Sequence, residues 1–310
     1  MPASTNPLTS ELRSRLRAEF PFLRARDLAA AERVGEGWCT TAYRVGNLAV
    51  RVPKSETCAA PLALEPRLVP ALEAAGVPFV PRGMRAALDA EGRLLATAHE
   101  YVAGEPARHV RPLPRGAARD ALARDLGRFL GRLHGFPVTD ARRLGVPERD
   151  LWPDQYVPLI AAARPHLGAR TRQWLDGLCA AFLDAGGSSG APRVVVHGDV
   201  DGRNVLLDDG GKLSGVIDYS DAMLADPALD FACILNDWSW AFLERVLAHY
   251  PIEVDADLRR RTAFYITIGP LFEVRQGVAT GDLVMLRRGR AALARRAAAG
   301  RGVEPSPRGP

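Results

Sequence analysis

The sequence is poor in cysteine, and its cysteines are not arranged for a metal site or a disulfide framework. It contains four, Cys39, Cys58, Cys179 and Cys233, with no Cys-x-x-Cys pair. Disulfide-rich secreted domains contain more cysteines, and zinc sites place cysteine or histidine pairs close together in the sequence, which these cysteines do not show. We therefore expect four unpaired thiols, no zinc site and a reducing, cytoplasmic location.

Long apolar runs are also missing. No stretch reaches the roughly 18 uncharged apolar residues that a membrane-spanning helix needs. The opening residues, MPASTNPLTSELRSRL, lack the apolar core and the small-residue cleavage site of a signal peptide. The sequence therefore predicts a protein without a membrane partner.

The net charge of +5 is the feature of the composition that suggests an anionic partner. The arginines are spread along predicted helices and mixed with acidic residues, which favours nucleotide phosphate over nucleic acid. The 310 residues, 47% of them hydrophobic, can bury the cores of two lobes. Oligomeric state leaves no mark in the sequence, so a monomer is the default expectation.

Strand patterns come early in the chain and helix patterns come later. Residues 31–52 predict two strands joined at Gly46-Asn47, a favourable hairpin dipeptide, and residues 94–102 predict another strand. The clearest helix is 116–134, where leucines and a phenylalanine line one face. Further helices are expected at 8–19, 62–75, 170–184, 227–249, 257–278 and 282–299, and short strands at 194–196, 205–207 and 213–217.

This order predicts an α+β protein with two lobes. We expect a small β-rich N-terminal lobe at residues 1–102 and a larger helical lobe at residues 103–300. The glycine, proline and arginine of residues 301–310 predict a disordered tail.

The motif with the most chemical content is His197-Gly198-Asp199, followed by Asn204 and Asp218. Phosphoryl transfer needs a carboxylate to orient the attacking hydroxyl and oxygen ligands to hold Mg²⁺ on the phosphates. Asp199 is spaced to be that carboxylate, with Asn204 as one metal ligand. Asp218, at the end of the next predicted hairpin, can return to the same site as the second ligand. We expect His197 to orient the loop.

The segment VVVHGDVDGRNVLLDDGGKLSGVIDYSDAMLADPALDFA resembles the central block of the aminoglycoside phosphotransferase superfamily. The resemblance extends over residues 8–290 and is strongest between 194 and 235. It implies a bilobal protein-kinase-like fold, a catalytic Asp199, and ATP or GTP as phosphoryl donor with Mg²⁺. The patterns after residue 51 and at 265–282 are closest to aminoglycoside 2''-phosphotransferases and macrolide phosphotransferases.

The segment from Val34 to Ala42 resembles the glycine-rich loop of kinases. Gly35 and Gly37 would let backbone N–H groups approach the phosphates, and Thr40 or Thr41 would bond a phosphate oxygen. The third glycine of the pattern is missing. An ordinary hairpin turn with glycines is the alternative.

Ala49 and Arg51 align with the V-A-I-K strand of kinases, so an arginine replaces the usual phosphate-binding lysine. Arginine can pair with phosphate bidentately, though with a different geometry. Lys54 is an alternative ligand, but in a regular strand it points to the opposite face. Glu65 resembles the helix glutamate that pairs with this cation. The alternatives are a solvated strand charge for Arg51 and a surface glutamate for Glu65.

The segment His99-Glu100-Tyr101-Val102 resembles the kinase hinge. The resemblance implies that backbone groups of Glu100, Tyr101 and Val102 meet the purine edge. The alternative is a strand that ends at a glycine turn.

The acceptor pocket is expected in the helical lobe, facing Asp199. Aminoglycosides are polycations that need carboxylates, whereas macrolides need a largely apolar pocket. The candidate contacts are acids and a tryptophan, so neither acceptor is excluded. Solvated helix charges and core packing are the alternatives for these side chains, which are Asp201, Asp237, Trp238 and Glu273.

Three functions remain open. The first is an antibiotic O-phosphotransferase, with an aminoglycoside favoured over a macrolide or a cyclic peptide antibiotic. The second is a kinase for a metabolite such as a sugar or an amino alcohol. The third is a non-catalytic nucleotide-binding relative, which the replaced lysine allows and the complete Asp199, Asn204 and Asp218 set opposes. Outside the site, we expect Asp226 and Asp230 to bond the catalytic loop and His134 to pack at a helix end.

Overall fold

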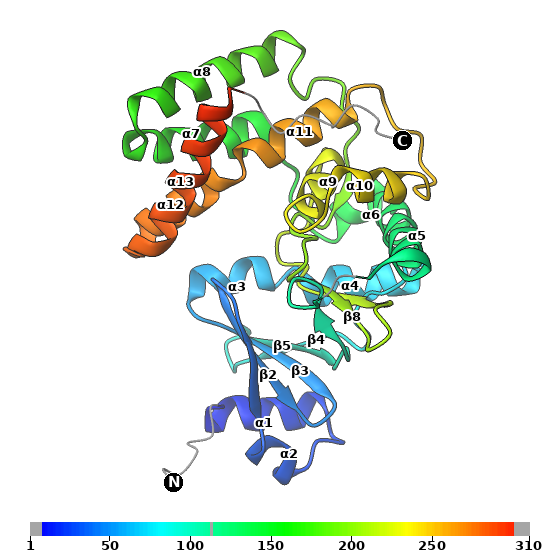
Figure 1. The fold of residues 1–310 in the computed structure, drawn as a ribbon. Coiled ribbons are helices and arrows are strands. Elements are labelled where there is room, and N and C mark those ends of the chain that lie inside the picture. The colour runs from blue at the N-terminus through cyan, green and yellow to red at the C-terminus, as the bar shows by residue number, and fades with distance from the viewer. Residues whose placement is uncertain (1–7, 112–113, 301–310) are drawn as a thin grey trace.

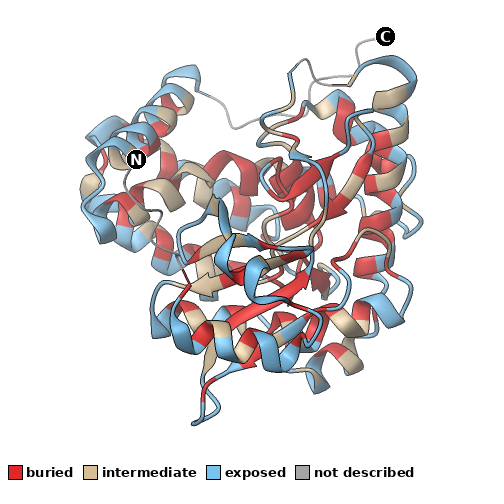
Figure 2. Ribbon diagram, turned by 90° about the horizontal axis from the view of Figure 1, so that it is seen from below, coloured by how far each residue is buried: buried red, intermediate tan, exposed pale blue. Residues whose placement is uncertain are grey.

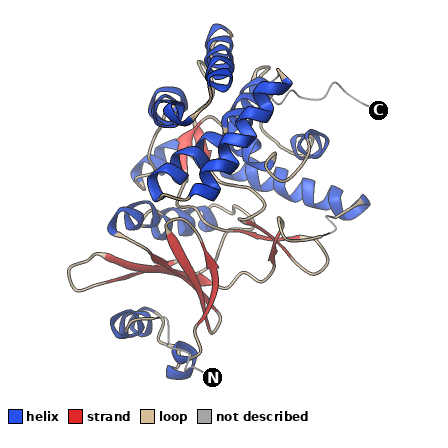
Figure 3. Ribbon diagram, turned by 60° about the vertical axis from the view of Figure 1, so that its left-hand side comes forward, coloured by secondary structure: helices blue, strands red, loops and turns tan. Residues whose placement is uncertain are grey.

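The computed structural model describes residues 8–111 and 114–300 and has the predicted α+β architecture (Figure 1). Its N-terminal part is an antiparallel five-stranded sheet with the order β1-β2-β3-β5-β4. Helices lie on both sides of this sheet (Figure 3). The elements are α1 (Ser10–Glu19), α2 (Ala25–Ala29), β1 (Glu32–Glu36), β2 (Thr40–Val45), β3 (Leu48–Pro53), α3 (Glu56–Leu62), α4 (Glu65–Ala74), β4 (Arg85–Leu88) and β5 (Leu94–Glu100).

The hairpin between β2 and β3 has the predicted turn. Val45 pairs with Leu48, which leaves Gly46 and Asn47 as the two-residue connection, and Gly46 has a positive φ of 60°. Glycine adopts this conformation without the penalty of a side chain. Residues 31–52 nevertheless form three strands and not the two expected, because a tight turn after β1 divides the segment.

The predicted helix 62–75 is also divided. It is replaced by α3 and α4, which are separated at Ala63 and Leu64. Glu65 begins α4 and Pro66 follows it in the first turn, where a missing N–H is tolerated. The division sets the position of Glu65, which is fully buried.

The remaining chain is mostly helical, and its long helix α5 (Gly116–His134) has the predicted bounds. Two predicted helices are broken, one between Ile234 and Trp240 and the other at Gly269, where Pro270 starts a new helix. The elements are β6 (Glu105–Pro106), α6 (Val138–Arg143), one π-helical turn (Leu151–Tyr156), α7 (Val157–Ala163), one 3₁₀ turn (Arg164–His166), α8 (Ala169–Asp184), β7 (Val194–Val196), β8 (Val205–Leu207), β9 (Leu213–Val216), β10 (Met223–Ala225), α9 (Ala228–Ile234), α10 (Trp240–Leu247), α11 (Leu258–Ile268), α12 (Pro270–Thr280) and α13 (Leu283–Ala299).

Among the described residues, two clusters of buried hydrophobic side chains hold the fold together. Figure 2 shows along the ribbon which segments are buried. The smaller joins α1 to the sheet, with Leu12 and Leu16 one helical turn apart and both buried. The larger unites residues 64–84 with the helical part of the chain. Burying one leucine side chain contributes roughly 2 kcal/mol, so each cluster stabilises its elements substantially. The lobe boundary after residue 102 stays a prediction, and the predicted tail 301–310 lies outside the described residues.

The expectation of four unpaired thiols is wrong, because Cys39 and Cys58 form a disulfide with Cα atoms 5.0 Å apart. The β2–β3 hairpin brings them together: the N–H of Lys54 donates to the carbonyl of Cys39 (2.9 Å), and α3 starts two residues later. Their separation of 19 residues hid this proximity from the spacing argument. Cys179 and Cys233 are free.

In the part of the chain that the structure describes, none of the helices has the length and apolarity to cross a bilayer.

Candidate active site

The predicted catalytic loop joins β7 to β8 and rests on one buried carboxylate, Asp230. Its oxygens accept the backbone N–H groups of His197 and Gly198, both at 2.8 Å. The ring of His134 bonds the same carboxylate at 3.0 Å from the end of α5. The expected roles of Asp230 and His134 are confirmed. Asp226 has no bond to this loop among the described residues; it holds Arg261 instead.

Gly198 permits the sharp bend that brings Asp199 to the surface of the loop. Its φ is +83°, and a Cβ atom there would collide with the carbonyl oxygen of Asp221. His197 stabilises the bend: its Nδ1 accepts the N–H of Asp199 (3.3 Å), and its Nε2 donates to the carbonyl of Ile217 (3.1 Å). Burial lowers the pKa of His197, so the ring is neutral and orients the loop, as expected.

Asp199 and Asn204 lie in contact, as their spacing predicts. The Asn204 amide donates to Asp199 Oδ2 (2.9 Å) and to the Asp199 carbonyl (2.8 Å). Arg203 Nη2 lies 3.0 Å from Asp199 Oδ1. Burial raises the pKa of Asp199 to about 8; Arg203 opposes this shift, and Asp201, a neighbouring carboxylate, adds to it.

Asp218 follows β9 and has a left-handed backbone, with φ +70°, which aspartate tolerates better than most residues. Its Oδ1 accepts from Arg51 Nη2 and Ser220 Oγ, each at 2.6 Å. Burial alone would raise the pKa of Asp218, but Arg51 and Ser220 outweigh it and hold the pKa below its usual range. The carboxylate is therefore ionised and binds a cation already.

Arg51 and Glu65 form a buried ion pair between β3 and α4. Glu65 also accepts the N–H of Tyr219 (2.8 Å) and the hydroxyl of Thr97 (3.2 Å). This one carboxylate thus connects the sheet to the segment that carries Asp218. Burial alone lowers the pKa of Arg51, but the charges of Glu65 and Asp218 outweigh it and raise the pKa. A solvated Arg51 and a surface Glu65 are both contradicted.

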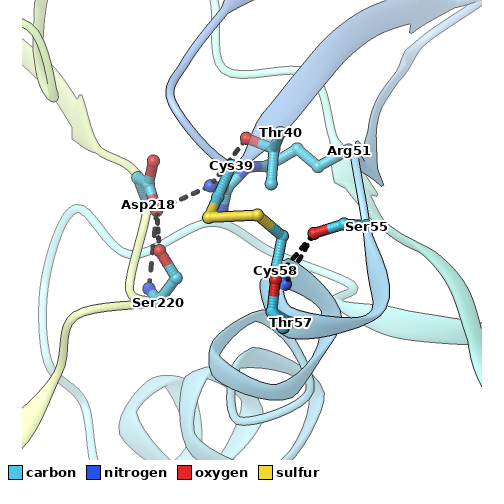
Figure 4. Close-up of a disulfide and its surroundings, with 8 residues drawn as sticks. All are labelled: Cys39, Thr40, Arg51, Ser55, Thr57, Cys58, Asp218 and Ser220. Atoms are coloured by element: carbon cyan, nitrogen blue, oxygen red, sulfur yellow. Dashed lines mark hydrogen bonds and ion pairs between the residues drawn. A yellow bond between two sulfur atoms is a disulfide. The ribbon is translucent and has the colours of Figure 1, made fainter. Parts of the chain in front are cut away.

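The glycine-rich segment forms a tight turn, and Thr40 at its end lies beside Arg51 (Figure 4). The N–H of Gly37 donates to the carbonyl of Thr40 (2.8 Å), and Gly35 lies in β1. Thr40 is buried and accepts Arg51 Nη2 (3.4 Å), whereas Thr41 pairs with β3. Lys54 is exposed and bonds Glu36 instead.

The hinge-like segment continues from β5. The N–H of Glu100 donates to the carbonyl of Arg82 (2.9 Å), and that of Tyr101 to Asn47 (2.7 Å). Among the described residues nothing accepts the N–H of Val102, whose side chain packs on Gly215. Of the three predicted hinge residues, Val102 alone has an N–H without an acceptor in the described part of the chain, and the role of all three at the purine stays a prediction. Ala49 pairs with His99 beside it.

The side chains predicted to bind the acceptor already have partners within the protein. Asp237 accepts Arg108 Nε (2.8 Å) and the N–H of Gly202 (2.9 Å), and Asp201, 1% exposed, is also bonded by Arg108. Trp238 is buried and stacks on Phe242. Glu273 on α12 pairs with Arg288 (2.9 Å) and has no contact with the other three among the described residues. Their role in acceptor binding stays a prediction.

Sequence reasoning missed two arginines at the loop. Arg203 joins Asp199 to Asp201, and Arg108 joins Asp201 to Asp237. The position of Arg203 directly before Asn204 was a usable signal, because a charge inside a catalytic loop has carboxylates for neighbours. Arg108 is 129 residues from Asp237 and carried no such signal.

Asn204 and Asp218 fit the metal that the resemblance implies. They offer oxygen donors, which Mg²⁺ prefers, and their segments are joined where the N–H of Ile217 donates to the Asn204 carbonyl (2.9 Å). Asp218 already holds the cation of Arg51. Magnesium in phosphoryl-transfer sites takes one or two carboxylates and completes its coordination with water and substrate phosphates.

Comparisons with known proteins agree with this geometry. The model of the family described as "Phosphotransferase enzyme family" (APH) matches residues 30–265. Viomycin phosphotransferase of Streptomyces vinaceus is 44% identical over 57 residues, which are 17% of this chain and 20% of that protein. YcbJ of Bacillus subtilis (strain 168) is 29% identical over 142 residues, 42% of this chain and 43% of that one. The chain thus spans less than half the length of the curated relatives it matches.

Solved structures are similar over nearly the whole chain. The complex of APH(2'')-IIIa with GDP and kanamycin is 25% identical, with a TM-score of 0.81 over 93% of this chain and 98% of that one. Macrolide 2'-phosphotransferases share the fold at 20% and 21% identity, with TM-scores of 0.63 and 0.64. With three quarters of its length matched by the family model, and with this kinase-like fold, the chain belongs to the phosphotransferase enzyme family.

Proposed function

We propose that this protein transfers the γ-phosphoryl group of ATP or GTP to a hydroxyl group of an antibiotic, with an aminoglycoside as the favoured acceptor. The supporting observation is an unbroken series of contacts. Arg51 pairs with Asp218, and the N–H of Ile217, directly before Asp218, donates to the Asn204 carbonyl. The Asn204 side chain in turn donates to the Asp199 carboxylate. These are the groups that phosphoryl transfer requires, in one site.

Each residue then has a defined task. Arg51 and the turn at Gly37 bind the phosphates, and Val102 binds the purine edge. Asn204 and Asp218 would hold Mg²⁺, which would supply positive charge to the phosphate oxygens. Asp199 orients the acceptor hydroxyl and takes its proton late, as the hydroxyl oxygen bonds to phosphorus and the nucleoside diphosphate leaves. The transfer is direct, without a phosphorylated enzyme.

The acceptor is proposed from relatives and from charge. Kanamycin is bound by the similar APH(2'')-IIIa, which supports an aminoglycoside. The local 44% identity to viomycin phosphotransferase supports a cyclic peptide antibiotic as the second candidate. Because Arg108 already bonds both Asp201 and Asp237, a polycation competes with this arginine for them or binds other carboxylates. We further propose that the protein acts as a cytoplasmic monomer, without a nucleic-acid or membrane partner.

The test is nucleotide consumption by the purified protein with Mg²⁺, with ATP or GTP, and with a panel of aminoglycosides, macrolides and cyclic peptide antibiotics. Turnover with an aminoglycoside, and a phosphorylated product of the expected mass, is the predicted result. Nucleotide binding without turnover on any antibiotic would contradict the antibiotic assignment and favour a metabolite kinase or a non-catalytic relative.

A further inference from the structure

The disulfide lies at the tight turn between β1 and β2, which we have proposed to bind the nucleotide phosphates (Figure 4). Cys39 lies in the turn between β1 and β2, two residues after Gly37, and Cys58 lies in α3. The disulfide therefore ties the turn between β1 and β2, which is proposed to bind the phosphates, to helix α3.

The neighbour of Cys39 connects this link to the charged site. Thr40 accepts Arg51 Nη2, and the same Nη2 lies 2.6 Å from Asp218. The disulfide thus holds the turn in the arrangement in which Arg51 is bonded to the expected metal ligand. A metal–nucleotide complex would use both Asp218 and Arg51, so it competes with the contact between them.

Apart from the disulfide, the turn is held by a hydrogen bond from the Gly37 N–H to the Thr40 carbonyl (2.8 Å) and by contacts of Lys54. Lys54 donates its N–H to the Cys39 carbonyl and pairs with Glu36 at 2.8 Å, with both side chains well exposed. Exposed ion pairs of this kind contribute little to a conformational equilibrium. Without the disulfide, the turn loses its covalent link to α3 and keeps only these hydrogen bonds and the exposed ion pair.

The pair is also reachable by small redox reagents, because Cys39 is exposed while Cys58 is buried. The large hydrophobic clusters make a structural disulfide unnecessary for a chain of this size. In the cytoplasm, the location proposed above for this protein, disulfides are usually transient and redox-sensing.

We propose that Cys39 and Cys58 are a reversible oxidation site that controls nucleotide affinity. The oxidised pair keeps the Arg51–Asp218 contact closed and weakens binding of the metal–nucleotide complex; the reduced pair releases the turn and strengthens it. This inference rests on the proposed function, because it requires a nucleotide at Arg51 and Asp218.

The chemistry is thiol–disulfide exchange with a small-molecule disulfide of the glutathione type. One protein thiolate attacks that disulfide and releases one small thiol, which leaves a mixed disulfide. The second protein thiolate attacks the mixed disulfide and releases the second small thiol. The two cysteines lose two electrons and two protons, and the reagent gains them. Excess dithiol reverses both steps.

The experiment uses the full chain, oxidised with glutathione disulfide or reduced with dithiothreitol. Peptide mapping after alkylation is expected to find Cys39 joined to Cys58 only in the oxidised sample. Calorimetry with Mg²⁺ and non-hydrolysable ATP and GTP analogues is expected to give about tenfold weaker binding in that sample, within the usual range of coupling between two sites. By reciprocity, the bound analogue makes the disulfide easier to reduce by the same factor.

Two variants and one control make the result specific. Cys58→Ser, and Cys39→Ser should the buried substitution fail to fold, are expected to bind like the reduced protein under both conditions. Cys179→Ser, at a free cysteine on α8, is expected to keep the full response. Equal affinity in both states, or no linked peptide after oxidation, overturns the proposal. Absence of nucleotide binding in both states contradicts the proposed function as well, which separates the two failures.

Discussion

Arg51 Nη2 lies 2.6 Å from Asp218 Oδ1, so the cation aligned with the phosphate-binding lysine of kinases is bonded to a carboxylate aligned with their metal ligand. The same guanidinium bonds the buried Glu65. One arginine therefore joins three segments that are far apart in the sequence. This relationship explains how the protein keeps its site assembled although the usual lysine is absent.

The buried pair of Arg51 and Glu65 predicts a large and non-additive effect on stability. Arg51→Met leaves the Glu65 carboxylate buried without its cationic partner, and the free energy of unfolding should fall by about 3–5 kcal/mol. The double variant with Glu65→Leu should lose less than the two single changes together. Denaturant unfolding measures both. Arg33→Met, at an exposed pair with Glu36, is the control and should change stability by less than about 1 kcal/mol.

Gly198 predicts a conformational effect at the catalytic loop. Gly198→Ala places a Cβ at φ +83° against the Asp221 carbonyl, so it should lower the free energy of unfolding by at least about 2 kcal/mol. Gly177 in α8 is exposed and has open space around it, so Gly177→Ala should stabilise by about 0.5–1 kcal/mol. Thermal unfolding of the two proteins tests this. Similar shifts for both would contradict the role given to the bend.

His99 predicts a loss of stability in acid. Burial lowers the pKa of its ring to about 4, below its ordinary value of 6.5. The pKa of His99 is lower in the folded than in the unfolded protein. The stability that neutral His99 contributes is therefore complete above about pH 6.5 and is lost as the pH falls towards 4. Between pH 7 and 4.5 this group should account for about 2–3 kcal/mol of the decrease.

The measurement is urea unfolding across that pH range. His99→Asn should flatten the pH dependence by this amount, whatever its effect at pH 7. His109→Asn, at an exposed histidine, is the control and should leave the slope as it is. An unchanged slope in His99→Asn would mean that another group causes the acid sensitivity.

The sequence was a good guide where local patterns determine the structure. The glycine–asparagine turn, the long helix α5 and the contact between Asp199 and Asn204 follow from spacing within one segment. Glu65 was found through a resemblance, and the structure shows why it matters: it bonds residues 14, 32 and 154 positions away.

The failures came from contacts between distant segments. The disulfide depends on the register of β2 against β3, which brings Cys39 to the start of α3. The acidic acceptor candidates were chosen by charge alone, and Arg108, from a different part of the chain, forms ion pairs with two of them. A sequence pattern reports which charges are present and gives no account of which ones are already paired.

The most direct test of the central claim is the Asp199→Asn variant in the transfer assay, once the panel has supplied an acceptor. The account predicts that transfer falls by about 10²–10⁴-fold, because the acceptor hydroxyl loses its proton acceptor, while binding of Mg²⁺ and nucleotide analogue is kept. Asp209→Asn, at an exposed aspartate in the turn between β8 and β9, should transfer like the unmodified protein. Transfer by Asp199→Asn at the rate of the unmodified protein would contradict the assignment of this loop as the catalytic centre.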